Sequence, residues 1–470
     1  MGLAAATSVM GLAVVLPRLS DWEVSVTPLT PERAAATGLR VLGWAPLRAA
    51  WEPRVGPGSL AALALAALAL LYAGRFASRW PWPRMLAMTF VMTVAWMTSL
   101  ATVDGLAGIG RVLDTTPEYL PTAREVTDLP TLLRTFIDRI PEGAPERWPV
   151  HISGHPPGAL LLFVLLVAVG LGSGLAAGMT VLLIAATTPV AVLATLRLLG
   201  AEPAARTVAP LLVFGPAAIW MAVSADGLFA AMSAWGLCCL AASATRQRWW
   251  STALWGIAAG VVLGYCAMLS YGLPLLSVLA MAILLVARNF RPLLWALGAA
   301  LLLVLSFAAA GFSWWEAFPV LRERYWDGIA QRRPASYWLW GNFAAFCFSA
   351  GPLAGVAAAT TVSRLRYNGR PPASNEAVVN PSSGWQEGDC TTPLCVTERV
   401  VVLLGCAAVV TLVVADLSRM SKAEVERIWL PFVPWLLVGC ALLPIRWQRP
   451  GLALQVGFAL TVQHLLFTQW

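Results

Sequence analysis

The stretch PVHISGHPPGALLLF, residues 149–163, decides how the rest of the chain is oriented. It contains His151 and His155, two of the three histidines in the sequence, followed by a double proline and an apolar run. As a helix, the run from Gly158 to Gly172 is about 22 Å long, whereas the hydrocarbon core of a bilayer is ~30 Å thick. Whether this run crosses the membrane determines on which side every later loop lies.

The composition is that of a membrane protein with many spans. Of the 470 residues, 59% are hydrophobic and only 12% are charged, about half the charged fraction of a soluble domain. We predict an all-α, polytopic transmembrane helix bundle that forms a single integral membrane domain over residues 1–470. Thirteen apolar blocks are long enough to cross with help from their flanks: 3–17, 58–74, 84–103, 178–196, 207–223, 228–245, 250–268, 272–287, 293–311, 337–361, 398–415, 428–444 and 451–467.

The first block and the 158–172 run need separate interpretations. The first block has no basic segment before it, so we expect a retained span and not a cleaved signal peptide. The 158–172 run is predicted to re-enter or to lie in the interface. With that choice, six short arginine-bearing loops all fall on one side, which the positive-inside rule makes cytoplasmic. We therefore expect a multi-pass protein of the cell inner (plasma) membrane whose active site faces outwards.

The charge pattern indicates topology and not nucleic-acid binding. The net charge is +8, but no basic run mixed with aromatic residues suggests a nucleic-acid partner. The predicted extracytoplasmic loops include 104–157, which holds eight of the 24 acidic residues, and 312–336. Loop 363–397 is expected to be flexible and cytoplasmic. It carries Cys390 and Cys395, the plausible disulfide pair, which should be reduced there.

Within loop 104–157, the segment DLPTLLRTFIDRI has apolar residues at helical spacing. Asp128 is placed to cap this helix at its start. An amphipathic helix beside a membrane most simply lies flat on the surface, and that is the arrangement we expect here.

Several acidic residues at the outer ends of spans are candidates for chemistry, because charge at membrane depth is costly. Asp104 ends the 84–103 span, Asp21 follows the first span, and Glu118 lies in the outer loop. Asp226 occupies a short break between two spans. The alternative for each acid is structural: a solvated carboxylate at a helix end or, for Asp226, a helix cap.

Basic residues near the same face are candidates for binding a phosphate. In SKAEVERIWLPFVPW, residues 421–435, Arg427 is flanked by Glu424 and Glu426 just where the apolar sequence begins. The planar fork of arginine donates two hydrogen bonds to a phosphate, although an arginine can also snorkel at the interface. Arg332 and Arg333 of loop 312–336 are alternative candidates for binding the phosphate.

The two histidines are four residues apart, but prolines follow at once. A residue before proline avoids the α region, so we predict an extended entry to a helix. His151 and His155 then either begin a membrane helix or bind an anionic or polyol ligand. A metal site is less well supported, because no third ligand is specified nearby. No cofactor is identified, and a divalent cation is not specified by the sequence.

Aromatic residues at the same face are candidates for binding sugar rings. They are Tyr271, in LSYG, and Trp338, Trp340 and Asn342, in YWLWGN. The alternative is the aromatic belt common at membrane interfaces.

The order of these features over residues 84–345 resembles the GT-C superfamily of integral-membrane glycosyltransferases. An acid ends an early span, an outer loop with an amphipathic helix follows, and HPP opens a partly embedded segment before a break with an acid. The resemblance implies a polyprenyl-phosphate sugar donor in the lipid bilayer and an envelope glycan acceptor. HPPG, YWLWGN and EVERIWLPF further resemble actinobacterial envelope proteins, among them transferases of methylthioxylose to the mannose caps of lipoarabinomannan. For these, the donor is a decaprenyl-phosphate sugar and the acceptor is a mannoside.

This resemblance implies roles for the candidates. Asp104 is expected to be the catalytic base, with Glu118 or Asp21 as substitutes, because an acceptor hydroxyl must lose its proton. Groups expected to bind the donor phosphate are His155, Arg427, His151, Arg332 and Arg333. Groups expected to bind the sugars are Asp226, Tyr271, Trp338, Trp340, Asn342, Glu424 and Glu426.

The alternative is a flippase or transporter for a lipid-linked glycan, which needs no base. The nearly charge-free spans favour the enzyme, because transporters carry charges in mid-span or paired broken helices. A third hypothesis is that the protein is a scaffold in an envelope-building complex, whose outer loops only form contact surfaces.

Overall fold

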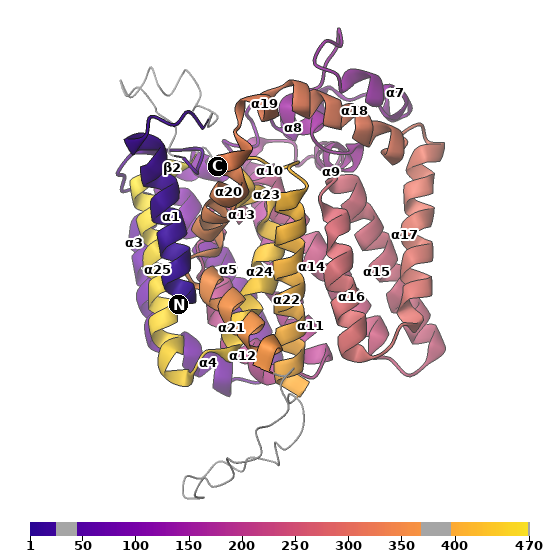
Figure 1. The fold of residues 1–470 in the computed structure, drawn as a ribbon. Helices are drawn as coiled ribbons and strands as arrows, with labels where there is room; N and C mark the ends of the chain where they lie inside the picture. The colour runs from indigo at the N-terminus through magenta and orange to yellow at the C-terminus, as the bar shows by residue number, and fades with distance from the viewer. Residues whose placement is uncertain (25–44, 368–395, 469–470) are drawn as a thin grey trace, which may run out of the picture.

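The computed structural model describes residues 1–24, 45–367 and 396–468 of the chain. Over these ranges the protein is a bundle of helices with a cap of shorter helices at one end (Figure 1). The bundle helices are α1 (Gly2–Leu19), α3 (Pro57–Leu68), α5 (Trp82–Ala101), α10 (Gly174–Ala185), α11 (Thr188–Leu198), α12 (Glu202–Val213), α14 (Ala225–Ala244), α15 (Trp249–Leu269), α16 (Leu276–Ala287), α17 (Arg291–Ala309), α20 (Ala335–Ala350), α21 (Leu353–Tyr367), α22 (Val396–Leu417) and α25 (Ile445–Leu465).

Shorter helices and single turns connect these elements. The shorter helices are α4 (Gly74–Arg79), α6 (Tyr119–Glu125), α7 (Leu129–Thr135), α8 (Val150–Ser153), α9 (Pro157–Ala168), α13 (Ala218–Met221), α18 (Trp314–Asp327), α19 (Ile329–Arg332), α23 (Val425–Ile428) and α24 (Val433–Leu437). The turns are η1 (Ala69–Ala73), η2 (Thr102–Asp104), η3 (Leu106–Ile109), η4 (Ile137–Arg139), η5 (Leu273–Leu275), η6 (Leu430–Phe432) and η7 (Val438–Leu442).

The predicted helical membrane bundle is confirmed, but the number of spans is not. In the described ranges, eight helices are long and apolar enough to cross a membrane, or nine if α20 and α21, bent by 107°, form one span. The other predicted spans coincide with helices that are short or interrupted, or that carry several polar residues near one end. Pro210 within α12 and Pro216 after it explain one break, since proline removes a backbone donor and clashes with the preceding turn.

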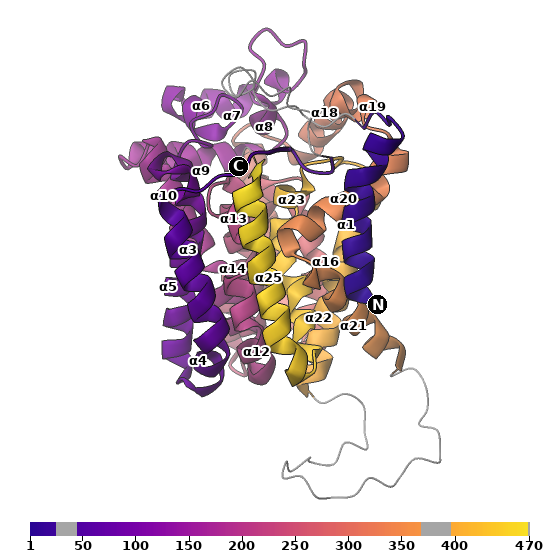
Figure 2. The same ribbon diagram turned by 90° about the vertical axis from the view of Figure 1, so that its left-hand side faces the viewer.

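The 158–172 run folds back to the end of the bundle at which it starts. Beside its start, the His155 ring lies 6.0 Å from the ring of Tyr119 in α6. Beyond its end, Nε of Arg124, also in α6, donates to the carbonyl oxygen of Gly172 at 2.8 Å. Figure 2 shows α9 and the start of α10 beside α6 at the cap. The run therefore does not carry the chain to the opposite end of the bundle, as the predicted orientation requires.

Close backbone packing holds this turn in place. A Cβ atom on Gly178 of α10 would overlap the carbonyl oxygen of Ile109 in η3, while a Cβ on Gly298 of α17 would meet open space. We expect Gly178→Ala to lower the free energy of unfolding by about 1–3 kcal/mol, because backbone atoms must move. Gly298→Ala, the matched control, should not destabilise, since alanine favours a helix interior. Thermal unfolding in detergent compares them, and equal melting temperatures would contradict this account.

The arginine-bearing turns lie at the end of the bundle opposite the cap. α4 and the turn between α16 and α17 both lie there in Figure 1, and α4 and α12 do so in Figure 2. The acid-rich loop 104–157 lies at the cap. Positive and acidic loops are therefore at opposite ends, which is the separation that the sequence predicts. Cys390 and Cys395, with most of loop 363–397, are outside the described residues.

The amphipathic segment of loop 104–157 packs inside the cap. The Asp128 side chain accepts a hydrogen bond from the backbone N–H of Thr131 at 3.2 Å, so the predicted cap is present. Most of the apolar stripe, however, is covered by protein: the ring of Phe136 lies 5.2 Å from Trp148 and 5.4 Å from Phe312, while Leu129 is 43% exposed. The expectation that this stripe lies on the membrane is wrong for Phe136 and Ile140, because loop 312–336 contacts both of them.

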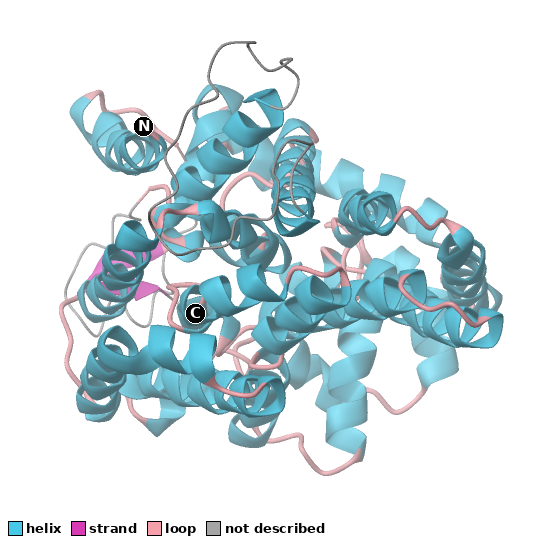
Figure 3. Cartoon of the chain, turned by 90° about the horizontal axis from the view of Figure 1, so that it is seen from below, coloured by secondary structure: helices cyan, strands magenta, loops and turns pink. Residues whose placement is uncertain are grey.

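Two short strands join segments that are far apart in the sequence. β1 (Ala49–Trp51) and β2 (Leu466–Thr468) pair antiparallel, with Ala49 opposite Thr468. Figure 3, which looks along the bundle, shows them at one side among the helices. The guanidinium groups of Arg54 and Arg111 lie 5.3 and 5.4 Å from the ring of Phe467 in β2.

Candidate functional site

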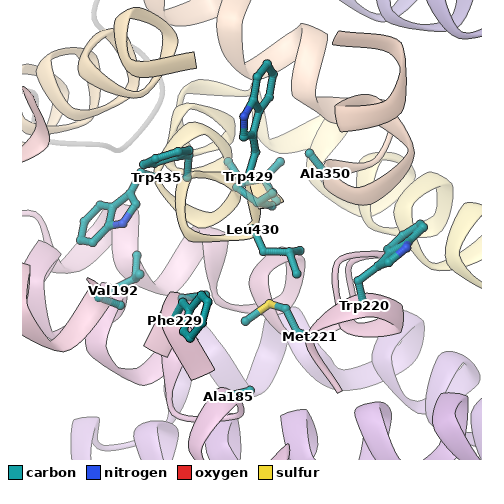
Figure 4. Packing of buried hydrophobic residues seen from close by; sticks show 14 of the residues in the cluster. Ala185, Val192, Trp220, Met221, Phe229, Ala350, Trp429, Leu430 and Trp435 are labelled. Atoms are coloured by element: carbon teal, nitrogen blue, oxygen red, sulfur yellow. The ribbon is translucent and has the colours of Figure 1, made fainter. Parts of the chain in front are cut away.

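A tightly packed apolar core fixes the two segments that carry the central charges. Figure 4 shows Leu430, just after α23, beside Met221 of α13 and Phe229 of α14, with Trp429 and Trp220 on the same turns. All five side chains are buried. Large aromatic groups contribute much of the free energy of a buried core. This core therefore sets the position of α23 relative to the start of α14.

Above this core, charged side chains from four segments meet in a buried cluster. Asp226 lies at the start of α14, Arg427 in α23, His151 in α8, and Glu118 just before α6. Glu424, just before α23, completes it, and the Glu118 and Asp226 side chains are almost fully buried. We call these five residues the charged cluster. Ionised groups are seldom buried unless they are paired or functional.

Arg427 is the centre of the charged cluster. Its Nη1 lies 2.6 Å from Oδ2 of Asp226, and its Nη2 lies 3.2 Å from Oε2 of Glu424. Nη2 also approaches Nε2 of His151 at 3.1 Å. Burial alone would lower the pKa of Arg427, but the carboxylates, Asp226 first, raise it above its usual value. The guanidinium is therefore permanently charged.

The contacts of His151 determine which ring nitrogen carries the proton. Arginine can only donate hydrogen bonds, so Nε2 of His151 accepts from Arg427. The proton is then on Nδ1, which donates to Oε1 of Glu118 at 2.8 Å. Burial works against ionisation of Glu118, but the contact with His151 outweighs it and lowers the pKa of this carboxyl. The imidazole of His151 thus links the Glu118 carboxylate to the guanidinium of Arg427.

Two further arginines add positive charge beside Glu424. Nη2 of Arg333 lies 3.7 Å from Oε1 of Glu424, and Arg48 is close enough to interact electrostatically with Glu424 and Arg427. Burial raises the pKa of Glu424, but Arg427, Arg48 and Arg333 together lower it to about 2. Glu424 is therefore ionised throughout the physiological range.

Glu426 is a buried carboxyl whose pKa is raised, in contrast to those of Glu118 and Glu424. It is 1% exposed, and neither carboxylate oxygen has a hydrogen-bond partner of good geometry within the described structure. Burial, with a smaller contribution from the charge of Glu424, raises its pKa to about 7. When it holds its proton, three guanidinium groups face three carboxylates. These are Arg48, Arg333 and Arg427 against Glu118, Asp226 and Glu424.

His155 lies in an aromatic pocket next to the charged cluster. Its Nδ1 donates to the carbonyl oxygen of Leu269 at 2.9 Å, and its ring lies 5.7 Å from that of Phe229. Burial lowers its pKa although Asp226 opposes this. His155 is thus a neutral group that can accept a hydrogen bond at Nε2, and not a cation.

Asp104 belongs to a separate ion-pair group. Its Oδ1 lies 2.8 Å from Nε of Arg54, and its Oδ2 lies 3.5 Å from Nη2 of Arg111. These are the arginines that flank Phe467, so this group ties the end of α5 to the strand pair. Asp21 is exposed at the end of α1, and Arg332 is exposed at the end of α19.

The aromatic candidates have structural contacts. Nε1 of Trp338, which is 1% exposed, donates to the Val24 carbonyl at 2.9 Å, and Nε1 of Trp340 donates to that of Ser336 at 2.9 Å. The ring of Tyr271 lies 5.4 Å from Trp314. These residues pack the cap and line no common site with the charged cluster in the described contacts.

Asn342 and Lys422 position the segment that leads into α23 and so the charged cluster. Nδ2 of Asn342 donates to Oδ1 of Asp416 at 2.8 Å and to the Ser421 carbonyl at 2.7 Å. Nζ of Lys422 donates to the carbonyls of Ala330 and Arg333 at 2.9 and 3.0 Å. Together they fix the segment that leads into α23 against loop 312–336.

No metal site accompanies this cluster in the part of the chain that the structure describes. No group of three or more His, Cys, Asp or Glu side chains there is placed to hold a metal ion. In the charged cluster, Arg427 occupies the centre of the carboxylates, which is the position that a bound cation would take.

Comparison with known proteins does not identify the chain. No family model matches it, and no curated protein or solved structure does either.

Proposed function

We propose that the protein is a glycosyltransferase that moves a sugar from a polyprenyl-phosphate donor to an envelope glycan acceptor at the cap, on the outer side of the plasma membrane. The observation that carries this proposal is Glu426, a buried carboxyl with a pKa of about 7 that lies near Arg48 and Arg427. A lipid-linked donor needs its phosphate at the end of an apolar bundle, where its chain can lie along the helices.

Glu426 has the properties that a general base needs. An acceptor hydroxyl must lose its proton as it attacks the anomeric carbon, and a base works best with a pKa near the working pH. Among the described residues, no side-chain donor contacts the oxygens of Glu426; the backbone N–H groups of Glu426 itself and of Arg48 lie close enough to lower its pKa. In contrast, both oxygens of Asp104 contact guanidinium groups. We therefore assign the base to Glu426 in preference to Asp104.

The leaving phosphate needs positive charge that is held in place before the reaction. We assign this role to Arg48 and Arg333, whose charges lie beside Glu424. Arg333 also contacts Glu424 and donates to the carbonyl oxygen of Lys422. Arg427 contacts both Asp226 and Glu424 at the centre of the charged cluster, so we assign it to organising that cluster. His155 adds a neutral hydrogen-bond acceptor at Nε2, suited to a sugar hydroxyl.

Asp104→Asn tests the assignment of the base. We expect transfer within tenfold of wild type, since the ion-pair group is separate from the charged cluster. We also expect a lower melting temperature, because Arg54 loses its charged partner, at a cost of about 1–3 kcal/mol. The assay is transfer of radiolabelled sugar from decaprenyl-phosphate donors, methylthioxylose included, to mannoside acceptors by purified protein.

The two possible failures of this assay are distinguishable. If wild type transfers from some donor but Asp104→Asn does not, Asp104 is the base and our assignment is wrong. If wild type binds the lipid donors and transfers no sugar to any acceptor, the transferase proposal itself is wrong.

A flippase for a lipid-linked glycan is the second candidate. It is favoured by the 107° break between α20 and α21, since transporters bind their substrates at interrupted helices. The test measures movement of a lipid-linked glycan across the bilayer of proteoliposomes that contain the Glu426→Gln variant. A flippase would still move the glycan, because it needs no base. A transferase would not move it.

A further inference from the structure

A cavity lies at the end of the bundle opposite the cap, away from the charged cluster. Its volume is about 480 Å³, within the range of small-molecule sites. It is formed where the turn between α14 and α15 meets the turn between α16 and α17, beside the end of α11. We call it the arginine pocket, because Arg246, Arg288 and Arg291 line it.

The arginine pocket has a positive charge that no carboxylate balances. Its lining contains three arginines and no acidic residue. In the described structure, none of these three guanidinium groups forms an ion pair. Other arginines at this end do: Arg206 pairs with Glu202 at 2.7 Å, and Arg364 pairs with Glu398 at 3.0 Å. Three like charges around one cavity repel each other, and a bound anion would relieve this repulsion.

Exposed aromatic residues place the arginine pocket at the level of lipid headgroups. Trp249 and Trp250, directly after the first turn, are 75% and 51% exposed, and Phe290, in the second turn, is 47% exposed. Exposed tryptophans at the ends of spans are typical of the membrane–water interface. A phosphate in the cavity would therefore lie where phospholipid headgroups lie.

We propose that the arginine pocket binds an anionic phosphate group, supplied by a phospholipid headgroup. Arginine recognises phosphate through paired, charge-assisted hydrogen bonds. Cationic pockets between membrane helices are suited to anionic headgroups. The amide of Asn289, whose Nδ2 donates to the Ala244 carbonyl at 2.8 Å, links the two turns that form the cavity.

The test compares two triple variants of equal charge. R246Q/R288Q/R291Q removes the arginines of the pocket, and R75Q/R79Q/R84Q removes three exposed arginines at the same end that do not line it. Purified proteins in neutral detergent are titrated with phosphatidylglycerol, phosphatidylcholine and inorganic phosphate. Binding is read by native mass spectrometry for the lipids and by the shift in melting temperature for all three.

We expect phosphatidylglycerol to bind wild type and the control variant equally, and the pocket variant at least tenfold more weakly. Phosphatidylcholine should not distinguish the three proteins. If inorganic phosphate alone shows the difference between the variants, the phosphate site stands but its source is soluble. If neither anion distinguishes the pocket variant from the control, the proposal is overturned. The single variants R246Q and R291Q repeat the test if the triple variant does not fold.

Discussion

Arg427→Met is expected to abolish sugar transfer and to lower the free energy of unfolding by about 3–5 kcal/mol, the range for removing one partner of a buried ion pair. The substitution leaves Asp226 and Glu424 without the guanidinium that now lies 2.6 and 3.2 Å away. It also removes the donor to Nε2 of His151, so the link to Glu118 loses its fixed tautomer. Thermal and denaturant unfolding in detergent measure the loss.

A double variant separates charge from packing. Asp226→Asn combined with Arg427→Met removes both charges, so it should be more stable than Arg427→Met alone, because no carboxylate of that pair is left unpaired. Arg427→Lys keeps the charge but not the planar fork, and we expect intermediate stability. If Arg427→Met melts at the wild-type temperature, the cluster does not hold the cap and our description of it is wrong.

Glu426→Gln is expected to reduce transfer by about 10²–10⁴-fold, the range for losing a general base, without loss of folding. Glutamine keeps the shape of the side chain but cannot take a proton. In wild type, transfer should rise with pH through about 7, the pKa of Glu426, and this rise should be absent from the residual activity of the variant. Glu323→Gln, at an exposed position in α18, is the matched control.

The same variant should change how stability depends on pH. Folding raises the pKa of Glu426 from 4.5 to about 7, so between these values the folded chain binds more protons than the unfolded chain. Stability from this group is full below pH 4.5 and is lost as the pH rises through about 7. The shift corresponds to about 3 kcal/mol. Glu426→Gln should therefore gain stability over wild type at pH 8 but not at pH 4, and parallel curves would contradict the assignment.

Sequence patterns predicted the helices of this protein better than they predicted how the helices pack against each other. Long apolar blocks predict helices because each must satisfy its backbone groups internally in lipid, and the long helices follow those blocks. The 158–172 run was too short to cross, and its return to α6 follows from that length. The break between α20 and α21 was not predicted, although Gly351 and Pro352 form a Gly-Pro pair, which marks a turn, and Gly351 has a φ of +80°.

For the candidate site, sequence reasoning selected the right kinds of residue but not their partners. Glu118, His151, Asp226, Glu424 and Arg427 are all among the candidates, and the structure brings them together. Arg48 was missed, because a single arginine between the predicted spans carries no local signal. Asp104 was favoured for its position at a helix end, but Arg54 and Arg111 reach it from other segments. Partners distant in the sequence are set by packing, which no local pattern contains.

The strand pair also has a consequence for the order of biogenesis. β1 is made early, yet its partner β2 follows α25 and leaves the ribosome hundreds of residues later. Contacts so distant in sequence form slowly. Until β2 arrives, Arg54 and Arg111 have no Phe467 to stack on, so this side of the cap stays open while the bundle assembles. Closure of this side of the cap thus waits for β2, and proteolysis at Glu52 during synthesis would report when the strands pair.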